Sequence, residues 1–104
     1  DVYARQPRAD LSVYATGKGA LEAMTRALAV ALAPEVRVNA IAPGAILWPD
    51  GGGDPALQAA ILARTALART GTPEEIAETA RWLLHDAAYT TGSVIAVDGG
   101  RTPL

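Results

Sequence analysis

The sequence has 104 residues, of which half are hydrophobic and 19% are charged, with a formal net charge of −2 and no cysteine. This composition is typical of one globular domain and excludes a disordered chain, a disulfide framework and a thiolate site. The absence of a basic run argues against nucleic-acid and membrane-surface partners, and no apolar stretch reaches the ~18 residues of a membrane span. The lack of cysteine fits a reducing compartment, so we expect a cytoplasmic protein.

The first regular element is predicted to be a long helix over residues 13–33, which Pro34 ends. Apolar side chains recur along it at three- and four-residue spacing and predict a buried stripe, made of Leu21, Met24, Leu28 and Leu32. A glycine inside a helix costs about 1 kcal/mol relative to alanine. Gly17 and Gly19 therefore suggest close approach by a cofactor or another helix.

A buried strand is predicted over residues 36–42, because this segment is rich in β-branched side chains and has few charges. Pro43 and Gly44 end it and open a loop at the carboxyl end of the strand, where ligands bind in open α/β sheets. The glycines at 51–53 are interpreted as a flexible turn. They do not form a phosphate-binding loop, because no hydrophobic strand directly precedes them.

Two further helices carry clear start signals. Asp54 is a predicted N-cap for a helix over residues 55–66. Thr72, followed three residues later by Glu75, predicts a capping box for a helix over residues 73–85. Its buried face is predicted to be Ile76, Ala80, Leu83 and Leu84. A last strand, residues 93–98, leads into the turn formed by Asp98, Gly99 and Gly100.

Tyr14 and Lys18 are four residues apart, so on a helix both side chains lie on one face. A phenol beside an ammonium suits proton transfer, because the positive charge favours the phenolate. The same spacing also occurs on surface helices that carry a solvated lysine and a packed tyrosine. The pair alone therefore does not identify a site.

Four segments together are more specific: Tyr14–Ala29, Val36–Gly44, Gly71–Ala77 and Thr91–Gly100. In this order they resemble the C-terminal half of a short-chain dehydrogenase/reductase. The resemblance implies an α/β fold that is the C-terminal part of a doubly wound, Rossmann-like parallel sheet. It further implies that residues 1–104 form a partial domain from which the Gly-rich, cofactor-binding N-terminal half is absent.

Within that family the sequence most resembles the pteridine reductases. Asp1 stands thirteen residues before Tyr14, where most of the family carries a serine, and the segment 42–49 is similar to the pteridine reductase loop. The resemblance implies reduction of a dihydropterin or dihydrofolate. A carbonyl or 3-oxoacyl reductase of the same family and a non-catalytic assembly remnant are the alternatives.

The resemblance also implies roles for individual residues. Tyr14 would donate the proton, Lys18 would favour the phenolate and bind the ribose hydroxyls, and Asp1 would hydrogen-bond the Tyr14 hydroxyl or the substrate. NADPH is the implied cofactor, and the residues expected near its nicotinamide are Tyr14, Lys18, Pro43, Gly44, Ala45 and Ile46. No metal is implied.

Trp48 replaces a threonine that many family members carry, and it either walls the substrate pocket or is a hydrophobic plug under the loop. The expected partners are a small-molecule substrate and other copies of the chain, through helix 13–33 and the C-terminal edge. Because the first half is absent, we expect this chain alone neither to bind a dinucleotide tightly nor to turn over, and to require a partner for solubility.

Overall fold

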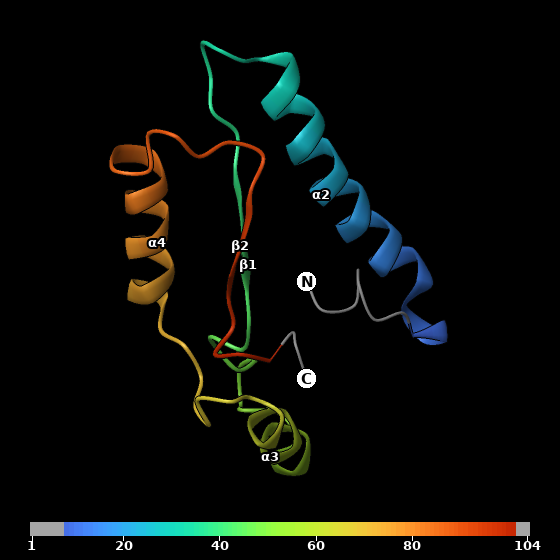
Figure 1. Ribbon diagram of the computed structural model, residues 1–104. Coiled ribbons are helices and arrows are strands. Elements are labelled where there is room, and N and C mark those ends of the chain that lie inside the picture. The colour runs from blue at the N-terminus through green and yellow to red at the C-terminus, as the bar shows by residue number, and fades with distance from the viewer. Residues whose placement is uncertain (1–7, 102–104) are drawn as a thin grey trace.

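The computed structural model describes residues 8–101 and orders them into two strands and four helical segments. In chain order these are η1 (Ala9–Leu11), α2 (Ser12–Ala31), β1 (Ala40–Pro43), α3 (Pro55–Ala63), α4 (Pro73–His85) and β2 (Val94–Val97). The two strands are parallel, with Ala40 opposite Val94 and Pro43 opposite Val97. Helices α2 and α4 lie on opposite sides of the strands (Figure 1). The α/β class and the parallel pairing predicted from the sequence are confirmed.

Helix α4 begins and ends where the sequence predicts. The Thr72 hydroxyl accepts a hydrogen bond from the Glu75 amide at 3.2 Å, and the Glu75 carboxylate accepts one from the Thr72 amide at 2.9 Å. These reciprocal bonds are the predicted capping box. At α3, the Asp54 carboxylate accepts a hydrogen bond from the Ala56 amide at 2.9 Å, which confirms the second predicted cap.

The strand predicted over residues 36–42 begins only at Ala40, because side chains make most of the hydrogen bonds between residues 37–39 and the neighbouring segment. The Arg37 guanidinium donates hydrogen bonds to three carbonyls in the last turn of α4 and the segment after it, those of Leu84, Ala87 and Thr90. The Asn39 side chain donates to the Thr90 carbonyl at 2.9 Å and accepts from the Ser93 amide at 3.0 Å. The predicted strand 93–98 likewise shortens to Val94–Val97.

Two predicted helices also end early. The helix predicted over 55–66 stops at Ala63, and the Leu67 amide instead donates to the Gly99 carbonyl at 3.0 Å. The helix predicted over 13–33 stops at Ala31, since a proline at position 34 disfavours the helical conformation in the residue before it.

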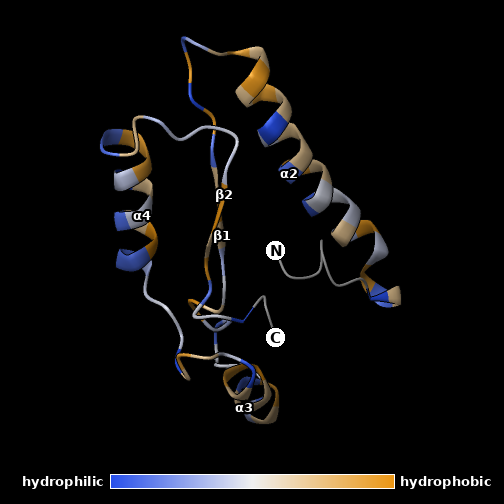
Figure 2. Cartoon of the chain, viewed as in Figure 1, coloured by the Kyte–Doolittle hydropathy of each residue, from blue (hydrophilic) through white to orange (hydrophobic). Residues whose placement is uncertain are grey.

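Helix α4 packs on the strands through a row of residues at three- and four-residue spacing. Leu83 is buried, and Ile76 and Ala80 are half-buried; Ala87, just after the helix, is buried as well. The outer side of the helix is hydrophilic (Figure 2). Leu84 was expected in this row, but it is 73% exposed, because it is turned about 100° from Leu83 around the helix axis.

The stripe predicted as buried on α2 is exposed in the described part of the chain. Side chains along it are 50%, 51%, 38% and 42% exposed, for Leu21, Met24, Leu28 and Leu32 respectively. The helix instead buries two small residues, Thr25 and Ala29. Within residues 8–101, a Cβ added at Gly17 or Gly19 would meet no atom within 4 Å, so the expected approach by a cofactor or another helix stays a prediction. Residues 8–101 thus leave this row, called the leucine row below, uncovered.

Candidate functional site

Tyr14 and Lys18 lie together in the first turns of α2. The Lys18 ammonium is 5.6 Å from the centroid of the Tyr14 ring, within the range of a cation–π contact. Tyr14 is 46% exposed, and Lys18 is half-buried. The two side chains therefore lie on one helix face, as predicted.

The loop after β1 is held against the end of β2. The Gly44 amide donates a hydrogen bond to the Val97 carbonyl at 3.0 Å, which continues the ladder by one residue. A Cβ at Gly44 would lie 2.6 Å from the Asp98 Cα. Since that neighbour is backbone, only glycine fits here without moving the two segments apart.

A second contact holds the same loop from the start of α4. The Gly71 amide donates to the Ala45 carbonyl at 2.9 Å, and a Cβ at Gly71 would lie 2.7 Å from the Ile46 Cδ1. Among the described residues, no hydrogen bond uses the amides of Ala45 or Ile46 themselves. Both amides are therefore unused donors within the described part of the chain.

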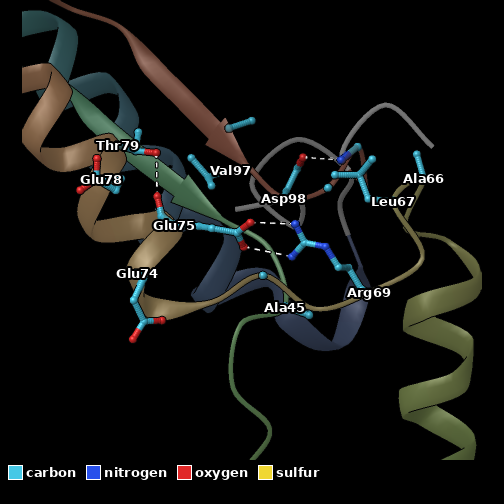
Figure 3. Close-up of a pocket in the computed structure, with 14 residues that line it drawn as sticks. Ala45, Ala66, Leu67, Arg69, Glu74, Glu75, Glu78, Thr79, Val97 and Asp98 are labelled. Atoms are coloured by element: carbon cyan, nitrogen blue, oxygen red, sulfur yellow. Dashed lines mark hydrogen bonds and ion pairs between the residues drawn. The ribbon is translucent and has the colours of Figure 1, made fainter.

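A groove of about 670 Å³ opens between the first turns of α4, the end of β2 and the segment 66–71 (Figure 3). The Arg69 guanidinium donates two hydrogen bonds to the Glu75 carboxylate across it, at 2.7 and 3.0 Å. Together with the hydrogen bond from the Thr72 amide, this lowers the pKa of Glu75 to about 2. Glu75 is therefore ionised and engaged at neutral pH, as its predicted structural role requires.

Two groups of candidate residues, the Tyr14 and Lys18 pair and the loop after β1, lie toward the same end of the molecule. Helix α2 runs opposite to β1, so the start of α2, with Tyr14 and Lys18, lies toward the end where β1 finishes (Figure 1). The carboxyl end of parallel strands is the usual ligand-binding edge of an α/β sheet.

Not every predicted site residue comes together. Of the candidates, Ala45 lines the groove beside α4, whereas Tyr14, Lys18 and Trp48 do not. Trp48 is half-buried in the loop after β1. Asp1 lies outside the described residues.

Residues 8–101 contain neither a metal-binding group nor a membrane-crossing helix. No group of three or more histidine, aspartate or glutamate side chains is placed to hold a metal ion in that range. Within the same range, no helix combines the length and hydropathy that a membrane crossing requires.

Comparison with known proteins covers almost the whole sequence. The family model described as enoyl-(acyl carrier protein) reductase matches residues 2–102. An inactive 2-(S)-hydroxypropyl-CoM dehydrogenase 2 from Xanthobacter autotrophicus is 41% identical over 103 residues, which cover 90% of this chain and 45% of that protein. L-xylulose reductase from Bos taurus is 42% identical over 94 residues, 86% of this chain and 38% of that protein.

Solved structures agree. A short-chain dehydrogenase/reductase described as a glucose/ribitol dehydrogenase, from Brucella melitensis, superposes with a TM-score of 0.78 at 35% identity. The match covers 95% of this chain and 39% of that one. The chain thus spans less than half the length of each of these three proteins. Since sequence and fold agree over nearly every residue of the chain, this protein belongs to the short-chain dehydrogenase/reductase family.

Proposed function

We propose that this chain supplies the proton-transfer half of an NAD(P)H-dependent reductase. Its family generally uses NAD(P) cofactors. The observation that carries the proposal is the Lys18 ammonium 5.6 Å from the ring of a half-exposed Tyr14. The bound cofactor supplies the hydride, and the Tyr14 hydroxyl gives the proton to the substrate atom that gains negative charge.

The other candidate residues serve binding and orientation. Lys18 binds the ribose hydroxyls and favours the phenolate that Tyr14 becomes after it donates. Ala45 and Ile46 present their amides to the nicotinamide carboxamide, and Pro43 and Gly44 set the course of that loop. We propose NADPH as the reductant, by family resemblance, with Asp1 assisting Tyr14.

Two substrate classes compete for this site. Asp1 in place of the usual serine supports a dihydropterin or dihydrofolate. The similarity to an L-xylulose reductase supports a carbonyl compound. Trp48 is proposed to wall the pocket for either class.

A different function is also proposed: a non-catalytic remnant that acts in assembly. Its support is the 41% identity to a relative whose name describes it as inactive. Retention of Tyr14 and Lys18 favours the enzyme.

We further propose that this partial domain, residues 1–104, is completed by a Gly-rich half, and we call the two together the assembled enzyme. The exposed leucine row of α2 supports assembly into a homo-oligomer, because large apolar surfaces on a helix are stable only when covered. The C-terminal edge is proposed as a second contact between copies. We propose a cytoplasmic location.

The test compares dihydrobiopterin with a simple ketone and a 3-oxoacyl thioester as substrates of the assembled enzyme, with NADPH consumption as the readout. Tyr14→Phe is run beside the wild type. Pterin turnover that is lost in the variant supports the pteridine assignment, whereas turnover of the ketone or thioester alone discards that substrate class. A wild type that binds NADPH but turns over none of the three supports the non-catalytic alternative.

A further inference from the structure

We propose that Arg69 and Glu75 are positioning residues for the cofactor-facing loop and that they act on it through Gly71. This inference rests on the proposed function, because it takes Ala45 and Ile46 as the residues that face the nicotinamide.

Arg69 and Glu75 close the segment before α4 into one turn (Figure 3). Arg69 makes two hydrogen bonds to the Glu75 carboxylate, at 2.7 and 3.0 Å, and a third to the Thr70 carbonyl at 2.9 Å. Glu75 also accepts from the Thr72 amide at 2.9 Å. A paired guanidinium and carboxylate of this geometry fix orientation as well as distance. The backbone between them, which includes Gly71, is therefore held on both sides.

Gly71 transmits that position to the loop after β1. Its amide holds the Ala45 carbonyl at 2.9 Å, and its bare Cα provides the surface on which the Ile46 side chain rests. The opposite side of the loop is fixed by the Gly44 amide on Val97. A shift of the turn thus moves Ala45 and Ile46 while Gly44 stays in place. Such a shift changes the direction of the two amides that are proposed to meet the cofactor.

The ion pair has no comparable role in global stability. The Arg69 and Glu75 side chains are 53% and 42% exposed, and exposed ion pairs contribute little to the free energy of unfolding. The capping box explains Glu75 but leaves Arg69 without a function. A local role in holding Gly71 accounts for both residues.

The experiment uses Arg69→Met and Glu75→Gln in the assembled enzyme. The glutamine keeps an oxygen that accepts from the Thr72 amide, so the cap is retained while the ion pair is lost. Matched controls are Arg81→Met and Glu78→Gln, because this pair lies on α4, the helix that carries Glu75, at 3.4 Å, and no hydrogen bond among the described residues joins it to Gly71 or to the loop after β1. Arg69→Lys keeps the charge without the forked geometry.

The measurements are the Kd for NADPH, KM and kcat, and hydrogen–deuterium exchange in the segments 44–46 and 69–72. We expect the Kd and KM for NADPH to rise about tenfold in Arg69→Met and Glu75→Gln, with faster exchange in both segments and little change in kcat. Arg69→Lys should recover part of the affinity. Both control variants should match the wild type.

Unchanged affinity in Arg69→Met, with NADPH bound normally by the wild type, overturns the inference and leaves the proposed function standing. Equal losses in Arg69→Met and Arg81→Met overturn it in the same way, since they indicate a general effect of charge. A wild type that binds no NADPH overturns the proposed function together with the inference. If Glu75→Gln unfolds, the contrast between Arg69→Met and Arg69→Lys decides the matter.

Discussion

Gly44 is the position at which a single added methyl group tests the packing of the site most sharply. A Cβ there would lie 2.6 Å from the Asp98 Cα, 2.9 Å from the Asp98 Cβ and 3.0 Å from the Asp98 carbonyl oxygen. Two of these three atoms are backbone, so a side-chain rotation cannot relieve the contact. Gly44→Ala must therefore move the loop after β1 away from the end of β2.

The cost has two parts. Overpacking of this kind typically costs about 1–3 kcal/mol, and loss of the hydrogen bond from the Gly44 amide to Val97 adds about 1 kcal/mol. We expect Gly44→Ala to lower the free energy of unfolding by about 2–4 kcal/mol. The cofactor-facing amides move with the loop, so the Kd for NADPH should rise as well.

Gly17→Ala is the matched control. It makes the same chemical change at a helix position where a new Cβ meets no described atom within 4 Å. Alanine in place of a helical glycine should raise the free energy of unfolding by about 0.5–1 kcal/mol. Both variants are compared with the wild type by urea unfolding of the assembled enzyme. A Gly44→Ala variant as stable as the wild type would refute the reasoning from the close contact with Asp98.

Three other predictions test separate parts of the structure. The pKa of Glu75 is about 2 in the folded chain against 4.5 as its ordinary value, so its contribution to stability, which is small because the side chain is 42% exposed, is present above pH 4.5 and is lost as the pH falls toward 2. The unfolding temperature should therefore fall slightly less steeply between pH 5 and pH 2 in Glu75→Gln than in the wild type. Gly71→Ala places the new Cβ against the Ile46 Cδ1 and should weaken NADPH binding. A second change, Ile46→Val, removes that Cδ1 atom, so the double variant should recover the lost NADPH affinity. Met24→Glu places a charge on the exposed row of α2 and should reduce the oligomer mass measured by light scattering, whereas an unchanged mass would place the interface elsewhere.

The sequence predicted best where the signal is local. The Thr72 and Glu75 capping box predicted the start of α4 correctly, because both partners of each hydrogen bond lie within one helical turn. The Tyr14 and Lys18 pairing is local in the same sense. Strand ends were less accurate: Arg37 and Asn39 alternate with apolar residues as in a strand, but their side chains bind carbonyls about fifty positions away in the sequence.

Contacts between distant segments could not be predicted from spacing. The bond from Gly71 to Ala45 depends on the course of the whole segment between them, including α3. The apolar period of α2 predicted a buried face, but periodicity does not say what would cover that face. Among residues 8–101 nothing covers it, and Leu21 and Met24 are 50% and 51% exposed.

The most direct test of the central claim is a single-turnover measurement on the assembled enzyme loaded with NADPH. Substrate is added, and the loss of NADPH absorbance is followed in the wild type and in Tyr14→Phe. If the Tyr14 hydroxyl donates the proton, the rate in the variant falls by about 10²–10⁴-fold while the Kd for NADPH stays within about twofold of the wild type. A variant that consumes NADPH at the wild-type rate would contradict the account, since no role for Tyr14 in proton transfer would then remain.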